Sequence, residues 1–277
     1  MTSFLENILG STRARVERQI KQRSLNDLDR DAFHTPKPRD FVAALRLEGM
    51  SVIAEIKRWS PSAGEIRAGV EPAEIAASYE AGGARAISVL TEPEFFHGSL
   101  EDIAGARSGS SLPILRKDFI VDVYQMAEAR LAGADAALLI LAALPDQGLF
   151  EELFEAACAY ELCPLIEVHD EYELERAFEV DPEVIGVNQR DLKTFEVDTS
   201  LAIRLRREIP RETVMVAESG IKSRKDVEEL ENAEVDAILV GEALMRAEDP
   251  ARAMAELLGT DYETDGHQTD GQAAGNG

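Results

Sequence analysis

Cysteine is scarce in this chain, and long apolar segments are missing. The two cysteines, Cys158 and Cys163, are too few for a disulfide framework. Their spacing lacks the further Cys or His that a zinc site requires, so we expect free thiols in a reducing compartment. The longest apolar run, Ala136–Leu144, is about half of the ~20 residues that span a membrane, and the N-terminal segment has no apolar core like that of a signal peptide. We therefore expect a soluble, cytoplasmic protein.

Basic residues are also few. The 277-residue chain has 29 Lys and Arg against 53 Asp and Glu, a net charge of −24. Such a surface repels nucleic acid and anionic lipid, so we expect neither nucleic acid nor a membrane as a partner. Residues 259–277 carry four acids, no Lys or Arg and almost no apolar residues, which predicts a disordered acidic tail. The acidity of the rest favours a halophilic protein whose charges are screened by salt, with an ordinary acidic protein as the alternative.

Eight short aliphatic or β-branched segments alternate with helical patterns. They are almost continuously apolar, which is typical of parallel strands buried on both faces. They are Ser51–Lys57, Ala86–Thr91, Pro113–Lys117, Ala136–Leu141, Pro164–Val168, Val184–Asn188, Val214–Glu218 and Ala237–Gly241. The helical patterns are Pro72–Ala81, Val123–Leu131, Asp146–Tyr160, Glu171–Phe178, Leu201–Glu208, Ser223–Leu230 and Ala243–Leu258.

Eight strand–helix units in a chain of this length predict a fold of the α/β class, a (β/α)8 TIM barrel over residues 49–258. A doubly wound sheet is the alternative. Residues 1–48 contain an amphipathic helix near Phe4 and Ile8 and a second helical stretch at Phe41–Leu47. We expect this N-terminal helical extension to cap the barrel or to lie beside its mouth. A monomer is the favoured oligomeric state.

Polar side chains gather where the predicted strands end, which is the catalytic face of barrel enzymes. Burying Lys or Glu is costly unless partners are supplied, so several such groups at one face predict a single polar site. Taken singly, each could be a surface residue or a structural ion pair. The residues are Glu55, Lys57, Lys117, Glu167, Asn188, Arg190 and Glu218.

Small residues follow the last two predicted strands, at Ser219-Gly220 and Gly241-Glu242. Barrels commonly bind phosphate there, because backbone N–H groups and a helix N-terminus point at the anion. Ser60, after the first strand, can add a hydroxyl. These features predict a small phosphorylated substrate. The histidines show no metal-ligand spacing, and we expect neither a metal nor a cofactor.

Seven sequence blocks together resemble a known family. The blocks are AEIKRWSPSAG (Ala54–Gly64), ISVLTEPEFFHGS (Ile87–Ser99), LRKDFIVD (Leu115–Asp122), LIEVHDEYELERA (Leu165–Ala177), GVNQRDLKTFEVD (Gly186–Asp198), VAESGI (Val216–Ile221) and ILVGEALM (Ile238–Met245). In order and spacing they resemble indole-3-glycerol-phosphate synthase of tryptophan biosynthesis, up to about residue 258. That family is a carboxy-lyase that closes the ring of 1-(2-carboxyphenylamino)-1-deoxyribulose 5-phosphate with loss of CO2 and water.

The resemblance implies five catalytic residues. Lys117 would be the general acid at the ribulose carbonyl and hydroxyl, and Glu167 would assist loss of the hydroxyl as water. Lys57, held by Glu55, would bind the anthranilate carboxylate. Asn188 would orient the network around Lys117.

The resemblance also implies binding residues. Arg190 would orient the substrate, while Glu218 and Ser219 would contact the ribulose hydroxyls. The aromatic ring would lie against Phe96, Phe119 and Leu192, whereas Phe95 is almost as readily explained by core packing. The phosphate would be held by Ser60, Gly220, Gly241 and the backbone N–H of Glu242, with the Glu242 side chain pointing outward.

Two further expectations concern the chemistry. Lys57 and Arg190 should lower the pKa of Lys117 and so suit it to proton donation, whereas Gln189 should face away from the site and matter little.

Two alternative functions for this fold fit the sequence less well. An aldose–ketose isomerase would share the phosphate site but commonly carries Cys or Asp after the early strands. A non-catalytic barrel would be expected to lose one of the paired Lys and Glu positions, and all of them are present.

Overall fold

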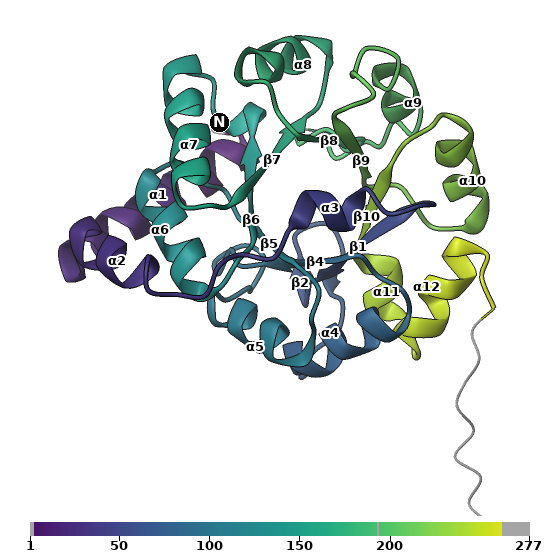
Figure 1. Cartoon of the computed structure of the whole chain (residues 1–277), viewed down its shortest axis with the longest axis horizontal. Helices are drawn as coiled ribbons and strands as arrows, with labels where there is room; N and C mark the ends of the chain where they lie inside the picture. The colour runs from purple at the N-terminus through teal and green to yellow at the C-terminus, as the bar shows by residue number, and fades with distance from the viewer. Residues whose placement is uncertain (1–2, 193, 262–277) are drawn as a thin grey trace, which may run out of the picture.

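Eight parallel strands close into a barrel in the computed structural model, which describes residues 3–192 and 194–261. Each strand pairs with the next along the chain, and β1 pairs with both β4 and β10 to close the ring (Figure 1). The (β/α)8 barrel is therefore confirmed, and the doubly wound alternative is wrong. The strands are β1 (Ser51–Ile56), β4 (Ala86–Leu90), β5 (Ile114–Lys117), β6 (Ala136–Ile140), β7 (Cys163–Val168), β8 (Val184–Asn188), β9 (Val214–Glu218) and β10 (Ala237–Val240).

Helices cover the outside of the barrel and join successive strands (Figure 1). Many begin at an acidic cap: Asp122, Asp146 and Asp170 each accept a hydrogen bond from a backbone N–H of the first turn. The helices are α4 (Pro72–Ala81), α5 (Glu101–Gly109), α6 (Val123–Ala132), α7 (Gln147–Ala159), α8 (Glu171–Ala177), α9 (Leu201–Leu205), α10 (Arg224–Asn232), α11 (Glu242–Arg246) and α12 (Pro250–Leu258). Two short 3-10 helices follow β6 and α8, at Leu141–Ala143 and Phe178–Val180.

Strand alternation stacks a polar layer on an apolar one inside the barrel. Buried apolar residues from several strands form one interior cluster, among them Ile53, Leu115, Leu165 and Val216. Because successive side chains of a strand alternate between its faces, the residues two positions later enter the same interior. Those residues are Glu55, Lys117, Glu167 and Glu218. The polar groups thus stand on a packed floor at the carboxyl ends of the strands.

The N-terminal extension occupies both expected places. It consists of α1 (Phe4–Gln22), α2 (Leu25–Ala32) and α3 (Phe41–Leu45). Helix α3 lies across one end of the barrel in Figure 1, with Phe41 and Leu45 buried in the interior cluster. Residues of α1 reach the opposite end, where they line the cavity described below.

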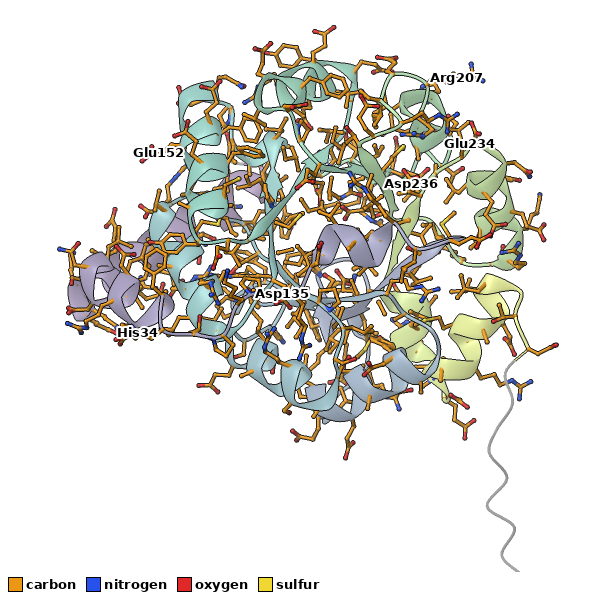
Figure 2. All side chains as sticks on the ribbon, viewed as in Figure 1. His34, Asp135, Glu152, Arg207, Glu234 and Asp236 are labelled. Carbon is orange, nitrogen blue, oxygen red and sulfur yellow. The ribbon has the colours of Figure 1, made fainter. Side chains whose placement is uncertain are left out.

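A buried carboxylate, that of Asp135, connects the N-terminal extension to the amino end of the barrel. Asp135 (labelled in Figure 2) precedes β6, and its side chain is fully buried. It accepts hydrogen bonds from the backbone N–H groups of Arg39 and Ile114 and from the Arg107 guanidinium. Charge-assisted bonds of this kind fix the linker from the extension against the barrel.

Some local predictions were wrong. The predicted helix Ala243–Leu258 is two helices, α11 and α12, because Pro250 cannot donate a backbone hydrogen bond and Asp249 caps a new helix. Helix α9 ends at Leu205, three residues before the predicted end.

Other elements were not anticipated from the sequence. Helix α5 was missed, because only Ile103 and Ala106 are buried along it and its pattern is weak. Helix α2 was also missed, as was a small hairpin of β2 (Trp59–Ser60) and β3 (Gly64–Glu65) in the loop after β1. The acidic tail predicted from residue 259 lies outside the described residues from residue 262 onward. Along the described ranges, no helix is both long and apolar enough to cross a membrane.

Candidate active site

A cavity of about 450 Å³ opens at the carboxyl ends of the strands. It is lined by all of the residues that the sequence assigns to catalysis or binding: Glu55, Lys57, Ser60, Phe96, Lys117, Phe119, Glu167, Asn188, Arg190, Leu192, Glu218, Ser219, Gly220, Gly241 and Glu242. Phe95 stands apart, because its ring packs edge-on against Phe4 and is not part of the lining that the described residues form. Core packing therefore explains Phe95.

Lys117 lies between two buried carboxylates. Its Nζ is 2.6 Å from Glu218 Oε2 and 3.2 Å from Glu167 Oε2, and both glutamates are only 2% exposed. The three groups come from β5, β9 and β7, which strand pairing through β6 and β8 brings to the same rim. A lysine in this position can give a proton to a substrate oxygen while a carboxylate beside it takes one away.

The charges in this cluster set the protonation states. Burial alone would lower the pKa of Lys117, but Glu218, Glu167 and Glu55 outweigh burial and raise it. Burial would raise the pKa of Glu167, but Lys117 and His169 together bring it well below its ordinary value. Burial and the neighbouring Glu167 raise the pKa of Glu218 to about 7, despite Lys117. At neutral pH the cluster therefore holds a cationic lysine, an ionised Glu167 and a Glu218 that readily exchanges a proton.

The expected lowering of the Lys117 pKa was wrong. Lys57 is not among the main groups that shift the pKa of Lys117, and its Nζ forms an ion pair with Glu55 Oε2 at 2.6 Å. Arg190 donates instead to the backbone carbonyl of Phe195 at 3.1 Å. The nearest charges to Lys117 are therefore anions, which favour its protonated form.

A chain of hydrogen bonds orients Glu167 from β8 and β9. Asn188 Nδ2 donates to Glu167 Oε1 at 3.0 Å, and Ser219 Oγ donates to Asn188 Oδ1 at 2.8 Å. Ser219 has a positive φ of 66°, a conformation that costs energy for a residue with a side chain. Gln189 Nε2 donates to the Ser219 carbonyl at 2.8 Å and so supports that conformation from outside the cavity. Gln189 faces away as expected, yet it buttresses the site.

Apolar groups form a second wall of the cavity. The rings of Phe96 and Phe119 lie 6.2 Å apart with an interplanar angle of 35°. Phe96 follows a turn organised by Glu92, a buried residue that the sequence reasoning did not single out. The Glu92 carboxylate accepts hydrogen bonds from the backbone N–H groups of Phe95 and Phe96, at 2.6 and 3.0 Å. A planar aromatic group fits against this wall.

Helix α1 contributes lining residues that the sequence did not reveal. Phe4, Leu5 and Ile8 line the cavity, and Arg15 from the same helix forms an ion pair with Asp118 at 3.1 Å. Asp118 immediately follows Lys117 in the chain, so the helix is anchored beside Lys117 and its two carboxylate partners. The sequence predicted that α1 has a buried face and that the extension caps the barrel or lies beside its mouth, but not which residues line the cavity.

Backbone geometry shapes the rest of the rim. Gly220 has a positive φ of 80°, and Gly241 is the residue before α11. The Glu242 carboxylate is 2.9 Å from Arg246 Nε, and both Arg246 and Lys222 are among the lining residues. Backbone N–H groups at the start of a helix, together with cations in the lining, suit an anionic group.

Gly186 leaves the space that Glu218 occupies. A Cβ at this strand position would lie 2.4 Å from Glu218 Oε1 and 2.7 Å from Leu165 Cδ2. Any larger residue would therefore force the Glu218 carboxylate or the Leu165 side chain to shift.

Comparison with known proteins decides the family. The profile of the family described as indole-3-glycerol phosphate synthase matches residues 5–257. The chain is 49% identical over 256 residues to the indole-3-glycerol phosphate synthase of Streptomyces griseus, covering 92% of this chain and 95% of the relative. It is 45% identical over 265 residues to that of a Polaromonas species, covering 94% and 100%. The chain belongs to the indole-3-glycerol phosphate synthase family.

Solved structures outside this family share the barrel alone. A tryptophan synthase complex from Pyrococcus furiosus matches with a TM-score of 0.57 at 16% identity, covering 76% of this chain and 98% of that one. A mutant tryptophan synthase alpha-subunit from the same organism matches with a TM-score of 0.56 at 17% identity, with the same coverage. Within the described part of the chain, no group of three or more His, Cys, Asp or Glu is arranged to hold a metal ion.

Proposed function

We propose that the cavity binds 1-(2-carboxyphenylamino)-1-deoxyribulose 5-phosphate and converts it to indole-3-glycerol phosphate, releasing one CO2 and one water. The observation that carries this assignment is Lys117, held between Glu167 and Glu218 above the apolar floor of a family-typical barrel. The reaction needs a proton donor at a carbonyl, a proton acceptor nearby and a dry place for an aromatic ring. The cavity supplies all three.

Lys117 acts as the general acid. As the anthranilate ring carbon attacks the ribulose carbonyl, Lys117 gives its proton to the oxygen that becomes a hydroxyl. Loss of CO2 from the same ring carbon returns the bonding electrons to the ring. Glu218, with a pKa raised to about 7 by burial and Glu167, returns a proton to Lys117. Lys117 then protonates the leaving hydroxyl, while Glu167 takes a proton from the methylene carbon beside the nitrogen, so that water leaves and the indole is complete. Solvent protons restore Glu218, and Glu167 gives its proton back to solvent, before the next turnover.

The remaining groups position the two ends of the substrate. Lys57, paired with Glu55, binds the anthranilate carboxylate, and the ring lies against Phe96, Phe119 and Leu192. Asn188, Arg190 and Ser219 hold the ribulose chain. The phosphate is bound by Ser60, Gly220, Gly241 and the Glu242 backbone N–H, a placement supported by the positive φ of Gly220 and the cations nearby.

The local charge balance is compatible with a dianionic phosphate. Five cationic and five anionic side chains are found among the described residues that line the cavity, whereas the whole chain carries −24. The excess acidity therefore lies on the solvated exterior.

We infer from this acidic exterior a monomeric enzyme of a salt-rich cytoplasm. Its turnover should be kept or increased in about 2 M KCl. Loss of turnover at that salt concentration, with recovery on dilution, would contradict the halophilic assignment.

The test of the proposed function is turnover of the synthetic substrate, followed by the fluorescence of the indole product. The wild-type chain should form product, and Lys117→Met should lose at least about a thousandfold in kcat while retaining the fold. Arg211→Met is the matched control, because Arg211 is an exposed residue paired with Glu234, whose side chain is labelled in Figure 2. Product formation by Lys117→Met at the wild-type rate would refute the role of Lys117, and no product from the wild type would refute the function.

A further inference from the structure

His169 is the first residue after β7, two positions beyond Glu167. Its Nε2 forms an ion pair with Glu167 Oε1 at 3.1 Å but does not have the geometry of a hydrogen bond to it, whereas its Nδ1 is within hydrogen-bond distance of Glu173 Oε2, at 3.1 Å. The imidazole is 12% exposed and stands behind Glu167, outside the lining that the described residues give to the cavity. His169 can therefore act on substrate only through Glu167.

The first turn of α8 fixes this imidazole in place. Asp170 caps the helix by accepting a hydrogen bond from the Glu173 backbone N–H at 2.8 Å. The Glu173 carboxylate reaches back and accepts a hydrogen bond from the His169 backbone N–H, also at 2.8 Å. With the carboxylate held in this way, its Oε2 meets the ring nitrogen and sets the ring orientation.

Glu167 is thus held from two sides. Its Oε2 faces Lys117, while its Oε1 receives the Asn188 amide at 3.0 Å and faces the His169 ring. Burial would lower the pKa of His169, but Glu167 and Glu173 raise it to about 10. The ring is therefore an imidazolium at neutral pH, a second cation beside Glu167.

We propose that His169, clamped by Glu173, is a positioning residue that anchors Glu167 Oε1 and leaves Oε2 free to exchange protons with Lys117 and the substrate. This inference rests on the proposed function and adds a group that the reaction scheme above does not use. The imidazolium favours the ionised, proton-accepting form of Glu167. Its removal should impair chemistry rather than substrate binding.

The first test is His169→Gln, which keeps an amide donor of similar reach and removes the positive charge. We expect kcat to fall by about tenfold to a hundredfold with KM within about twofold of wild type. The charged groups that face Glu167 are Lys117 from β5, Glu218 from β9 and His169 itself, with Glu55 acting on both Lys117 and Glu218. Loss of one cation from this set should raise the pKa of Glu167. The acidic limb of the kcat profile should therefore move upward by about one pH unit.

The second test is Glu173→Gln, which leaves the imidazole and removes one of its two carboxylates. The pKa of His169 should then fall below its wild-type value of about 10. The kcat profile should acquire an alkaline decline at the pH where the ring loses its proton, and this decline should be absent from the His169→Gln/Glu173→Gln double variant. A merely structural role of the pair would not create such a limb.

His34→Gln is the matched control, because His34 is an exposed residue just after α2, at the edge of the molecule and away from the cavity (Figure 2). It should match the wild type in kcat, KM and pH profile. An active wild type accompanied by unchanged kcat and pH limbs in both His169→Gln and Glu173→Gln would overturn the inference alone. An inactive wild type would overturn the proposed function and this inference together.

Discussion

Replacement of Glu218 by Gln tests the electrostatics of the cluster through protein stability. Glu218 is 2% exposed and touches Lys117 at 2.6 Å through Oε2. Its Oε1 is buried without a hydrogen-bond partner among residues 3–192 and 194–261. Glutamine has nearly the same volume as glutamate and keeps an oxygen that can accept a hydrogen bond from Lys117. It has no carboxyl group and therefore does not ionise.

The size of the effect follows from the pKa of Glu218. Folding raises that pKa from 4.5 to about 7, so the folded state favours the protonated carboxyl. A group with a raised pKa contributes stability that is complete below the unfolded value and is lost as the pH rises through the folded value. At 1.36 kcal/mol per pKa unit, Glu218 costs about 3 kcal/mol once fully ionised, of which about 2 kcal/mol is lost between pH 5.5 and pH 8.5.

The assay is urea unfolding followed by the fluorescence of the single tryptophan, Trp59, across that pH range. The free energy of unfolding of Glu218→Gln minus that of the wild type should increase by about 2 kcal/mol from pH 5.5 to pH 8.5. Other titrating groups, including His169, largely cancel in this difference. A difference that stays constant with pH, or that decreases, would show that the pKa of Glu218 is not raised and would refute the assigned protonation states.

Two further substitutions test the shape of the cavity. Gly186→Ala, whose Cβ would lie 2.4 Å from Glu218 Oε1, should reduce kcat by about a hundredfold and destabilise the fold by about 1–3 kcal/mol, measured by turnover and urea unfolding. Gly148→Ala, where the new Cβ would meet nothing closer than 3.5 Å, is its control, and equal behaviour of the two would contradict the close approach. Phe96→Ala should raise KM by about tenfold and change kcat little, because it removes apolar contact with the ring. Phe33→Ala, on an exposed ring, should leave KM unchanged, and an unchanged KM in Phe96→Ala as well would remove Phe96 from the binding wall.

The strands were readable from the sequence because every barrel strand is buried on both faces. Segments such as Val184–Asn188 and Val214–Glu218 are continuous apolar runs that end in one polar residue, and the structure gives the same bounds. Helix α4 was also placed correctly, because Pro72 starts it and Gly82 follows its end. The short hairpin at Trp59–Ser60 was not readable, since a two-residue strand has no periodicity.

The site was readable only in part. Strand ends placed Lys117, Glu167 and Glu218 on one rim, but their pairing depends on side-chain reach across strands distant in the sequence. The error over the Lys117 pKa has this origin, because the sequence does not show that Lys57 is already paired with Glu55. The contribution of Phe4 was hidden for a related reason: the sequence placed the helix at a barrel end or beside the mouth, but an amphipathic pattern does not say which residues of the buried face line the cavity.

The most direct test of the whole account is the stoichiometry of the reaction catalysed by the purified chain. With 1-(2-carboxyphenylamino)-1-deoxyribulose 5-phosphate as the only substrate, one CO2 should be released for each indole formed, without added metal or cofactor. Lys117→Met should bind the substrate and release neither. Substrate consumed without CO2 release, or CO2 released without an indole, would contradict the assignment of this barrel as the site of coupled ring closure and decarboxylation.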